Sequence, residues 1–252
     1  MKHSRLPGSL RFPSSSASYG IRRMPGGLNA LPDPTVIPWR AANWASNPLG
    51  NVYNDSDEVS TWIDLSLSGR DQIATTPDTL PRFVASASGM NNRSGLSYDG
   101  IDDGSAVSSP GTKAPPYSLV VIGKVNNPVG SDYERAIVST AGAYILYNWP
   151  ALGQVSAQAN GFTIGTRNYD SNAHFLVFYV NGASSYFEYN GVKVTGSVSL
   201  ATNIGDIRLG GVGGDYANYT YGFFGFYDGD VTAHPLWQDF SRSMSNYYGI
   251  VR

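Results

Sequence analysis

The chain has 252 residues and a net charge of −2, with charged residues making up 14% of it and no cysteine. The missing cysteine excludes a disulfide scaffold and thiolate metal sites. The low charged fraction, the 29 glycines and the 17 tyrosines argue against a helical protein, which usually carries many Lys and Glu residues on exposed faces. At this length an all-β sandwich can form a single domain around one core.

The first 40 residues are basic and irregular. They contain six basic residues against one acidic residue, so this segment carries +5 although the whole chain carries −2. Six prolines and the runs 14–16 (Ser) and 26–27 (Gly) interrupt any strand or helix period. We therefore predict an extended arm over residues 1–40, followed by a β-sandwich domain over residues 41–252.

Apolar residues are spread through this arm, which favours docking on a surface over the alternative, a solvated tail. A basic arm on an acidic body also favours an acidic partner. Another protein, a neighbouring copy of the chain or nucleic acid would fit, with nucleic acid the least expected. The candidate partner-binding residues are Arg5, Arg11, Phe12, Tyr19, Arg22 and Arg23.

The start of the chain carries no apolar run that resembles a secretory signal, so we expect synthesis in a host cytoplasm without export. The longest apolar runs, such as residues 119–122, are far too short to span a bilayer. No membrane partner is therefore expected.

The remainder reads as short strands separated by turns. Nearly continuous apolar runs predict buried strands over residues 118–125 and 174–180. The dipeptides at 181–182 and 190–191 are both Asn-Gly, which predicts two type I′ turns and hence three adjacent antiparallel strands. Further strands are predicted over 59–65, 136–138, 144–149, 207–209 and 221–227.

The end of the chain changes period. Leu236, Phe240 and Met244 recur at helical spacing, Pro235 suits a first turn, and Gly249 suits the position after the last turn. This predicts one amphipathic helix that packs on the sandwich.

Five segments, in order, resemble motifs of one known family. They are W-I-D-L-S at 62–66 with Gly69, L-S-Y-D-G-I-D-D at 96–103, H-F-L-V-F at 174–178 with Y-N-G at 189–191, G-F-F-G-F-Y at 222–227, and Y-G-I at 248–250. Residues 39–252 thus resemble the concanavalin A-like (laminin G-like) jelly-roll domains of phage virion and bacterial surface proteins. The resemblance implies a two-sheet antiparallel jelly-roll sandwich. It does not imply one function, because this fold hosts lectins, glycosidases and structural modules.

Catalytic chemistry is not expected. A glycosidase needs two carboxylates about 5–10 Å apart, whereas the three glutamates, Glu58, Glu134 and Glu188, are far apart in sequence. The three histidines are equally scattered, and His174, at the start of an apolar strand, fits a hydrogen-bonded structural role. The run at 210–214 matches no phosphate-loop pattern and is expected to be a loop.

The sequence leaves two possible binding sites undecided. Asp99, Asp102 and Asp103 could hold a calcium ion, although a turn is the more ordinary use of Asp and Gly, so no cofactor is predicted. Aromatic residues could stack on sugars, bind protein or fill the core. The candidate carbohydrate-binding residues are Trp149, Tyr169, Tyr216, Tyr219 and Tyr221.

These observations leave three hypotheses for the function of the chain. The first is a structural virion protein of a phage, namely a capsid decoration (cement) protein or another head or tail component. It would bind the major capsid protein or other virion proteins and its own copies, as a homo-oligomer for which a trimer is the natural guess. The alternative is a glycan-binding receptor-recognition module. The third and least expected is a glycan-cleaving enzyme.

Overall fold

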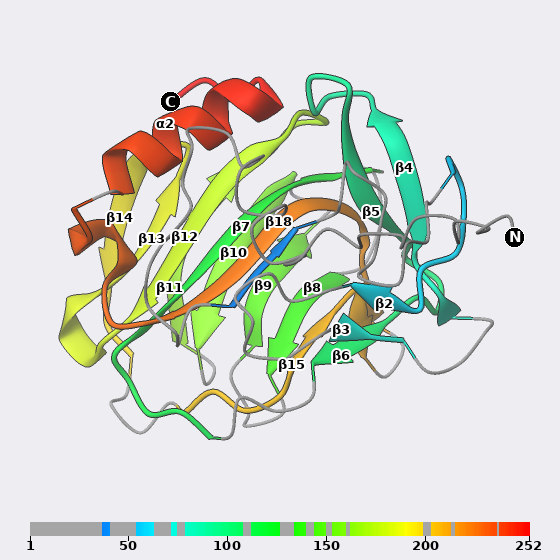
Figure 1. The fold of residues 1–252 in the computed structure, drawn as a ribbon. Helices are drawn as coiled ribbons and strands as arrows, with labels where there is room; N and C mark the ends of the chain where they lie inside the picture. Colours follow the sequence, from blue (N-terminus) through cyan, green and yellow to red (C-terminus); the bar gives the residue numbers. More distant parts are fainter. Residues whose placement is uncertain are drawn as a thin grey trace, which may run out of the picture.

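The computed structural model describes residues 37–40, 54–62, 72–74, 79–107, 112–126, 134–139, 144–149, 153–159, 162–198, 203–212, 215–235 and 237–252. Over these residues the chain is a largely antiparallel β-sandwich with a C-terminal helix, α2 (Trp237–Tyr248) (Figure 1). The all-β fold class predicted from the sequence is confirmed.

Two sheets form the sandwich. Sheet 1 has the spatial order β14 (Val192–Gly196), β13 (Ser185–Tyr189), β12 (His174–Val180), β7 (Tyr117–Val125), β18 (Asn218–Asp228), β5 (Arg93–Asp99) and β4 (Arg82–Ala87). Sheet 2 has the order β11 (Phe162–Asn168), β10 (Gln154–Ala159), β9 (Tyr144–Trp149), β8 (Glu134–Ser139), β15 (Ile207–Leu209), β6 (Ser105–Val107), β3 (Gln72–Ile73) and β2 (Thr61–Trp62). Off this order, β17 (Asp215–Tyr216) pairs with both β8 and β16 (Gly211–Val212).

The continuous apolar run of β7 is explained by its two covered faces. Leu119 and Val121 belong to the core between the two sheets. Val120 and Ile122 belong to a second cluster, on the other side of sheet 1, that contains the buried residues of α2. Because both faces of the strand are dry, neither face carries the polar alternation of a half-exposed strand.

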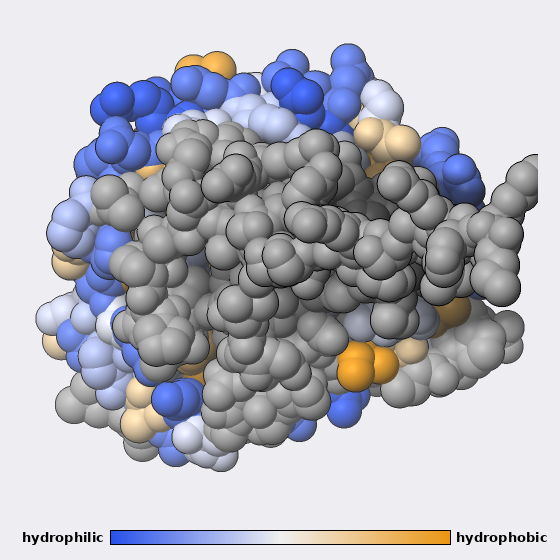
Figure 2. Space-filling view, viewed as in Figure 1, coloured by the Kyte–Doolittle hydropathy of each residue, from blue (hydrophilic) through white to orange (hydrophobic). Residues whose placement is uncertain are grey.

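The helix α2 binds sheet 1 through one apolar face. Trp237, Phe240, Met244 and Tyr248 are all buried. The rings of Trp237 and Phe240 pack edge-on against Phe175 of β12, with centroid distances of 5.7 and 6.3 Å. Burying each such side chain contributes roughly 1.5–3 kcal/mol. The opposite side of the helix is exposed, and Figure 2 shows mostly hydrophilic residues over it.

The end of α2 has the predicted form. Gly249 has a φ of 71°, and the N–H of Ile250 donates to the carbonyl of Ser245 at 2.8 Å. This is the closing pattern that glycine allows at a helix C-terminus.

Of the two Asn-Gly turns, only the second has the predicted type. Asn190 and Gly191 have φ values of 49° and 86°, as a type I′ turn requires. Asn181 has a φ of −160° and begins a 3₁₀ turn instead. Its N–H donates to Ser185 Oγ at 2.8 Å, and that hydroxyl donates to the carbonyl of Gly182, also at 2.8 Å. Side-chain bonds thus replace the tight turn, while the three-strand order β12–β13–β14 is as predicted.

The last four residues of the predicted arm lie in the sandwich. Residues 37–40 form β1 (Ile37–Arg40), an antiparallel partner of β18 in which Trp39 pairs with Phe224. The candidate partner-binding residues Arg5, Arg11, Phe12, Tyr19, Arg22 and Arg23 lie outside the described residues.

Candidate functional site: the outer face of sheet 2

Strand β10 shows which residues of sheet 2 face away from the core. Val155 and Ala157 lie in the core between the sheets. Successive side chains of a strand point to opposite faces, so Gln154 and Ser156 lie on the other face. In Figure 1, α2 lies beyond sheet 1, on the far side of the molecule from β8–β11. The polar face of β10 is therefore the outer face of sheet 2, away from the helix.

The strand register extends this face across five strands. Ser156 pairs with Thr166 of β11 and with Tyr147 of β9. Tyr147 pairs with Arg135 of β8, and Arg135 pairs with Tyr216 of β17. Residues paired directly across a sheet share a face. The row Tyr216, Arg135, Tyr147, Ser156 and Thr166, which we call row 1, therefore occupies the outer face.

A second row runs beside the first. Gln154 pairs with Trp149 of β9 and with Asn168 of β11. Each is two positions from its row 1 neighbour along the strand, so it occupies the same face. We call Trp149, Gln154 and Asn168 row 2.

A third row lies on the central strands. Ile207 and Leu209 are fully buried in the core, so Arg208 between them lies on the outer face. Arg208 pairs with Val138 of β8, which pairs with Tyr144 of β9. We call Arg208, Val138 and Tyr144 row 3.

The side chains described on this face offer polar groups. Ser156 and Thr166 form a hydroxyl–hydroxyl hydrogen bond of 2.9 Å. Asn168 is exposed, and Gln154 and Tyr216 are partly exposed. Hydroxyl, amide and guanidinium groups hydrogen-bond to polyols, and aromatic residues are the type on which apolar faces of sugar rings stack. Rows 1 to 3 thus contain the residue types that a sugar-binding surface requires.

The structure sorts the predicted carbohydrate-binding residues. Trp149 is in row 2 and Tyr216 in row 1. Tyr169 follows β11, is partly buried against the core, and donates its N–H to the Gly153 carbonyl at 3.0 Å.

Tyr219 and Tyr221 do not belong to a surface site. Their exposed fractions are 2% and 0%, because they lie on β18, inside sheet 1, and point into the core. The hydroxyl of Tyr221 donates to the carbonyl of Ala136, and its ring packs edge-on against Tyr98 at 5.2 Å. The sugar-stacking hypothesis for these two residues is therefore wrong.

The register also places on the face residues that the sequence reasoning did not select. They are Arg135, Tyr147, Gln154, Ser156, Thr166, Asn168 and Arg208. One signal was present, since the stretch 154–159, Q-V-S-A-Q-A, alternates polar and apolar residues as a half-exposed strand does.

The three aspartates that were weighed as possible calcium ligands, with a turn as the favoured interpretation, do come together. Ligand oxygens of Asp99, Asp102 and Asp103 all lie within 4.8 Å of one another. Asp99 Oδ1 accepts the N–H of Ile101 at 2.7 Å, and Asp103 Oδ2 accepts the N–H of Asp99 at 2.8 Å. Burial, opposed by that bond, raises the pKa of Asp103 to about 6. The bonds formed are those of an Asp-stabilised turn.

His174 has the structural role predicted for it. The N–H of Phe175 donates to Asn190 Oδ1 at 2.8 Å, which orients the Asn190 amide so that its nitrogen faces His174 Nδ1 at 3.2 Å. Nδ1 therefore accepts, and the proton of the neutral ring lies on Nε2, facing Tyr189 Oη at 3.0 Å and Asp170 Oδ1 at 3.3 Å. Burial lowers the pKa of His174, and Asp170 opposes part of that shift.

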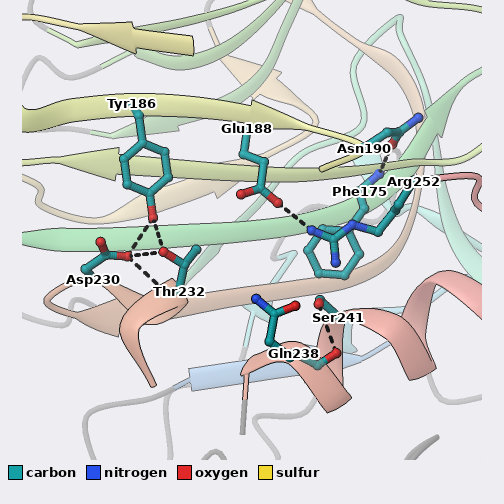
Figure 3. A network of polar contacts seen from close by, with 9 residues as sticks. All are labelled: Phe175, Tyr186, Glu188, Asn190, Asp230, Thr232, Gln238, Ser241 and Arg252. Atoms are coloured by element: carbon teal, nitrogen blue, oxygen red, sulfur yellow. Dashed lines mark hydrogen bonds and ion pairs between the residues drawn. The ribbon is translucent and has the colours of Figure 1, made fainter. Parts of the chain in front are cut away.

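A polar network lies on the outer side of sheet 1, near α2 (Figure 3). Tyr186 donates to Asp230 Oδ1 at 2.6 Å, and the same oxygen accepts the N–H of Thr232 at 2.9 Å. Burial and the bond to Asp230 raise the pKa of Tyr186. Arg252 pairs with the buried carboxylate of Glu188 at 2.6 Å. Because its groups satisfy one another, this network ties segments together and offers few free groups to a ligand.

No family model matches the chain, and no curated protein matches it. Solved structures share its fold. Trypanosoma rangeli sialidase superposes with a TM-score of 0.57 at 11% identity, over 91% of this chain and 37% of the sialidase chain. The binding domain of botulinum neurotoxin serotype D gives 0.51 at 9% identity, over 76% of this chain and 50% of that chain.

Domain 4 of AbnA, a GH43 extracellular arabinanase from Geobacillus stearothermophilus solved with arabinotriose, gives a TM-score of 0.50 at 10% identity. That match covers 84% of this chain and 97% of the domain. The chain spans little more than a third of the sialidase chains. Such low identities establish the fold alone, a β-sandwich of the kind present in these proteins.

In the described part of the chain, no helix is long and apolar enough to cross a membrane.

Proposed function

We propose that this chain is a glycan-binding, lectin-like module whose binding surface is the outer face of sheet 2. The observation that carries the proposal is the register that aligns rows 1 and 2. In that register Trp149, Tyr147 and Tyr216 pair with residues of the hydroxyl, amide and guanidinium types, and this pairing supports the proposal.

The likeness to the arabinanase domain supports this proposal, because that domain was solved with arabinotriose and nearly all of it is matched. The five family-like motifs further favour the concanavalin A-like type of sandwich, within which we place the chain. Binding without catalysis is part of the proposal. Incubation with the bound oligosaccharide should release no reducing sugar, and release that depends on one carboxylate would refute this part.

A glycan array, followed by titration calorimetry with the best-bound oligosaccharide, tests the proposal. Replacing Trp149 by Ala should weaken binding about tenfold or more, whereas Trp149→Phe, which keeps an aromatic ring, should retain most of it. Phe162→Ala is the matched control, since Phe162 is an exposed aromatic residue of the same sheet, outside the three rows. Absence of binding to every glycan, or equal binding by the Trp149→Ala variant, would overturn the proposal.

The capsid-decoration role, with a homo-oligomer as its form, remains a prediction. It was based on the basic arm, the lack of an export signal, of cysteines and of catalytic residues, and the family resemblance, and of the arm only residues 37–40 are described. Deleting residues 1–36 should leave a folded sandwich, and its loss from purified virions would support that role.

A further inference from the structure

Among the arginines whose side chains the structure describes, Arg93, Arg167 and Arg208 form no ion pair, but Arg93 and Arg167 donate to the backbone carbonyls of Tyr247 and Thr166 instead. Arg82 and Arg242 pair with Glu58 and Asp239, at 3.5 and 3.9 Å. Arg252 pairs with Glu188 at 2.6 Å. Arg208 forms no ion pair with any carboxylate that the structure describes.

Part of the Arg208 guanidinium group is also shielded from water. The Nε atom of Arg208 is buried and has no hydrogen-bond partner, while the side chain as a whole remains partly exposed. An unsatisfied buried donor lowers stability, and the loss is larger when the donor carries charge. An acceptor that arrives from the outer face would remove that loss.

The three rows contain two arginines and no carboxylate, and Asp206 directly precedes β15, two positions before Arg208. Row 1 contains a second arginine, Arg135, and none of the residues of rows 1 to 3 is acidic. A guanidinium group binds carboxylate and sulfate oxygens through two parallel hydrogen bonds, which a neutral hydroxyl cannot reproduce.

We propose, building on the glycan-binding function above, that the ligand is an anionic saccharide whose carboxylate or sulfate group binds Arg208, with Arg135 as a second cationic contact. The aromatic and amide residues of rows 1 and 2 would then bind the neutral part of the sugar. Arg208 is in this view a specificity residue that separates acidic from neutral glycans.

Titrations of the full chain with matched probe pairs test this assignment. The pairs are oligogalacturonate against its methyl ester, sialyllactose against lactose, and dextran sulfate against dextran. At least one anionic member should bind about tenfold tighter than its neutral counterpart, with an affinity that falls as salt is raised. The first two pairs identify a carboxylate ligand, and the third identifies a sulfate ligand.

Arg208→Gln should reduce that preference to about twofold or less, and Arg208→Lys should give an intermediate value, because the charge remains without the planar fork. Arg242→Gln, which removes an exposed arginine of α2 on the opposite side of the sandwich, is the matched control and should change nothing. Thermal melting of each variant checks folding. Should Arg208→Gln fail to fold, Arg135→Gln must lower the preference by at least half, and an unchanged preference would refute the proposal.

The outcomes separate the two proposals. Preferential binding of neutral glycans on an array, with Trp149-dependent affinity, would keep the proposed function and overturn the anionic ligand. Binding to no array member and to none of the probes would overturn both. An anionic preference that survives in the Arg208→Gln variant would overturn the role of Arg208.

Discussion

The outer faces of the two sheets differ in what covers them. The outer face of sheet 1 is apolar around Val120, Ile122 and Phe175, and α2 packs on it. The outer face of sheet 2 carries hydroxyl, amide and arginine residues, and α2 lies on the far side of the molecule from it (Figure 1). The difference indicates that apolar packing energy is concentrated on the helix-covered face, whereas the proposed glycan binding is assigned to the polar face.

The largest expected loss of stability comes from a substitution on the helix-covered outer face of sheet 1. Phe240 is 1% exposed and contacts the rings of Phe175, Phe223 and Trp237. Phe240→Ala should lower the free energy of unfolding by about 3–5 kcal/mol, because it leaves a cavity between α2 and sheet 1. Chemical denaturation measures it. The paired variant on the outer face of sheet 2, Thr166→Ala, removes one hydroxyl–hydroxyl hydrogen bond and should lower the free energy of unfolding by about 1 kcal/mol.

Similar losses for the Phe240→Ala and Thr166→Ala variants would contradict the comparison, since it assigns packing energy to one face. For glycan binding we expect the opposite order, with a larger loss for Thr166→Ala than for Phe240→Ala. The Phe240→Ala protein, where folded, should bind glycan as the parent does.

A smaller effect is expected at the ion pair beside α2. Glu188 is buried, and Arg252, whose side chain is 22% exposed, lies at 2.6 Å from it (Figure 3). Arg252→Gln leaves the carboxylate without its cation and should cost about 2 kcal/mol, less than for a fully buried pair because water reaches the guanidinium. The double variant Arg252→Gln with Glu188→Gln should recover part of the loss in denaturation experiments. If the double variant is no more stable than the single one, the pair is not what holds this end of the chain.

The smallest effect concerns pH. The folded state holds His174 neutral, with its pKa below that of the unfolded chain, near 6.5. The unfolded chain therefore binds more protons as pH falls through about 6.5, and stability should decrease in that range. Denaturation at pH 7.5 and pH 5.5 measures the difference. His174→Gln should flatten this part of the profile, and an unchanged slope would mean that other groups cause it.

Local sequence signals predicted much of sheet 1. The apolar runs at 118–125 and 174–180, the Asn190-Gly191 turn and the C-terminal helix each depend on neighbours in the chain, and each has its expected form. The turn at Asn181-Gly182 was predicted with the wrong type, because the hydroxyl of Ser185, four residues later, satisfies the backbone in another way. Strands β10 and β11 were overlooked, although residues 154–159 carry the alternating pattern.

The candidate site was less predictable. The sequence singled out aromatic residues, but it could not separate Trp149 and Tyr216, which share the outer face of sheet 2, from Tyr219 and Tyr221, which are buried. Whether a tyrosine on a strand faces solvent or core depends on the strand's partners and on what covers each face. Tyr216 and Tyr219 are three residues apart, yet Tyr216 is partly exposed and Tyr219 is buried.

Composition, apolar runs and turn residues, together with the five family-like motifs, were therefore enough to predict an all-β sandwich closed by a helix, because these signals act over a few residues. Apart from β12, β13 and β14, whose order the turns predicted, only the tertiary structure decided which strands lie side by side, and so which side chains share a surface. Row 1 joins residues 135, 147, 156, 166 and 216 through pairings across the sheet. Such long-range pairing depends on the packing of the whole core, and no local sequence pattern specifies it.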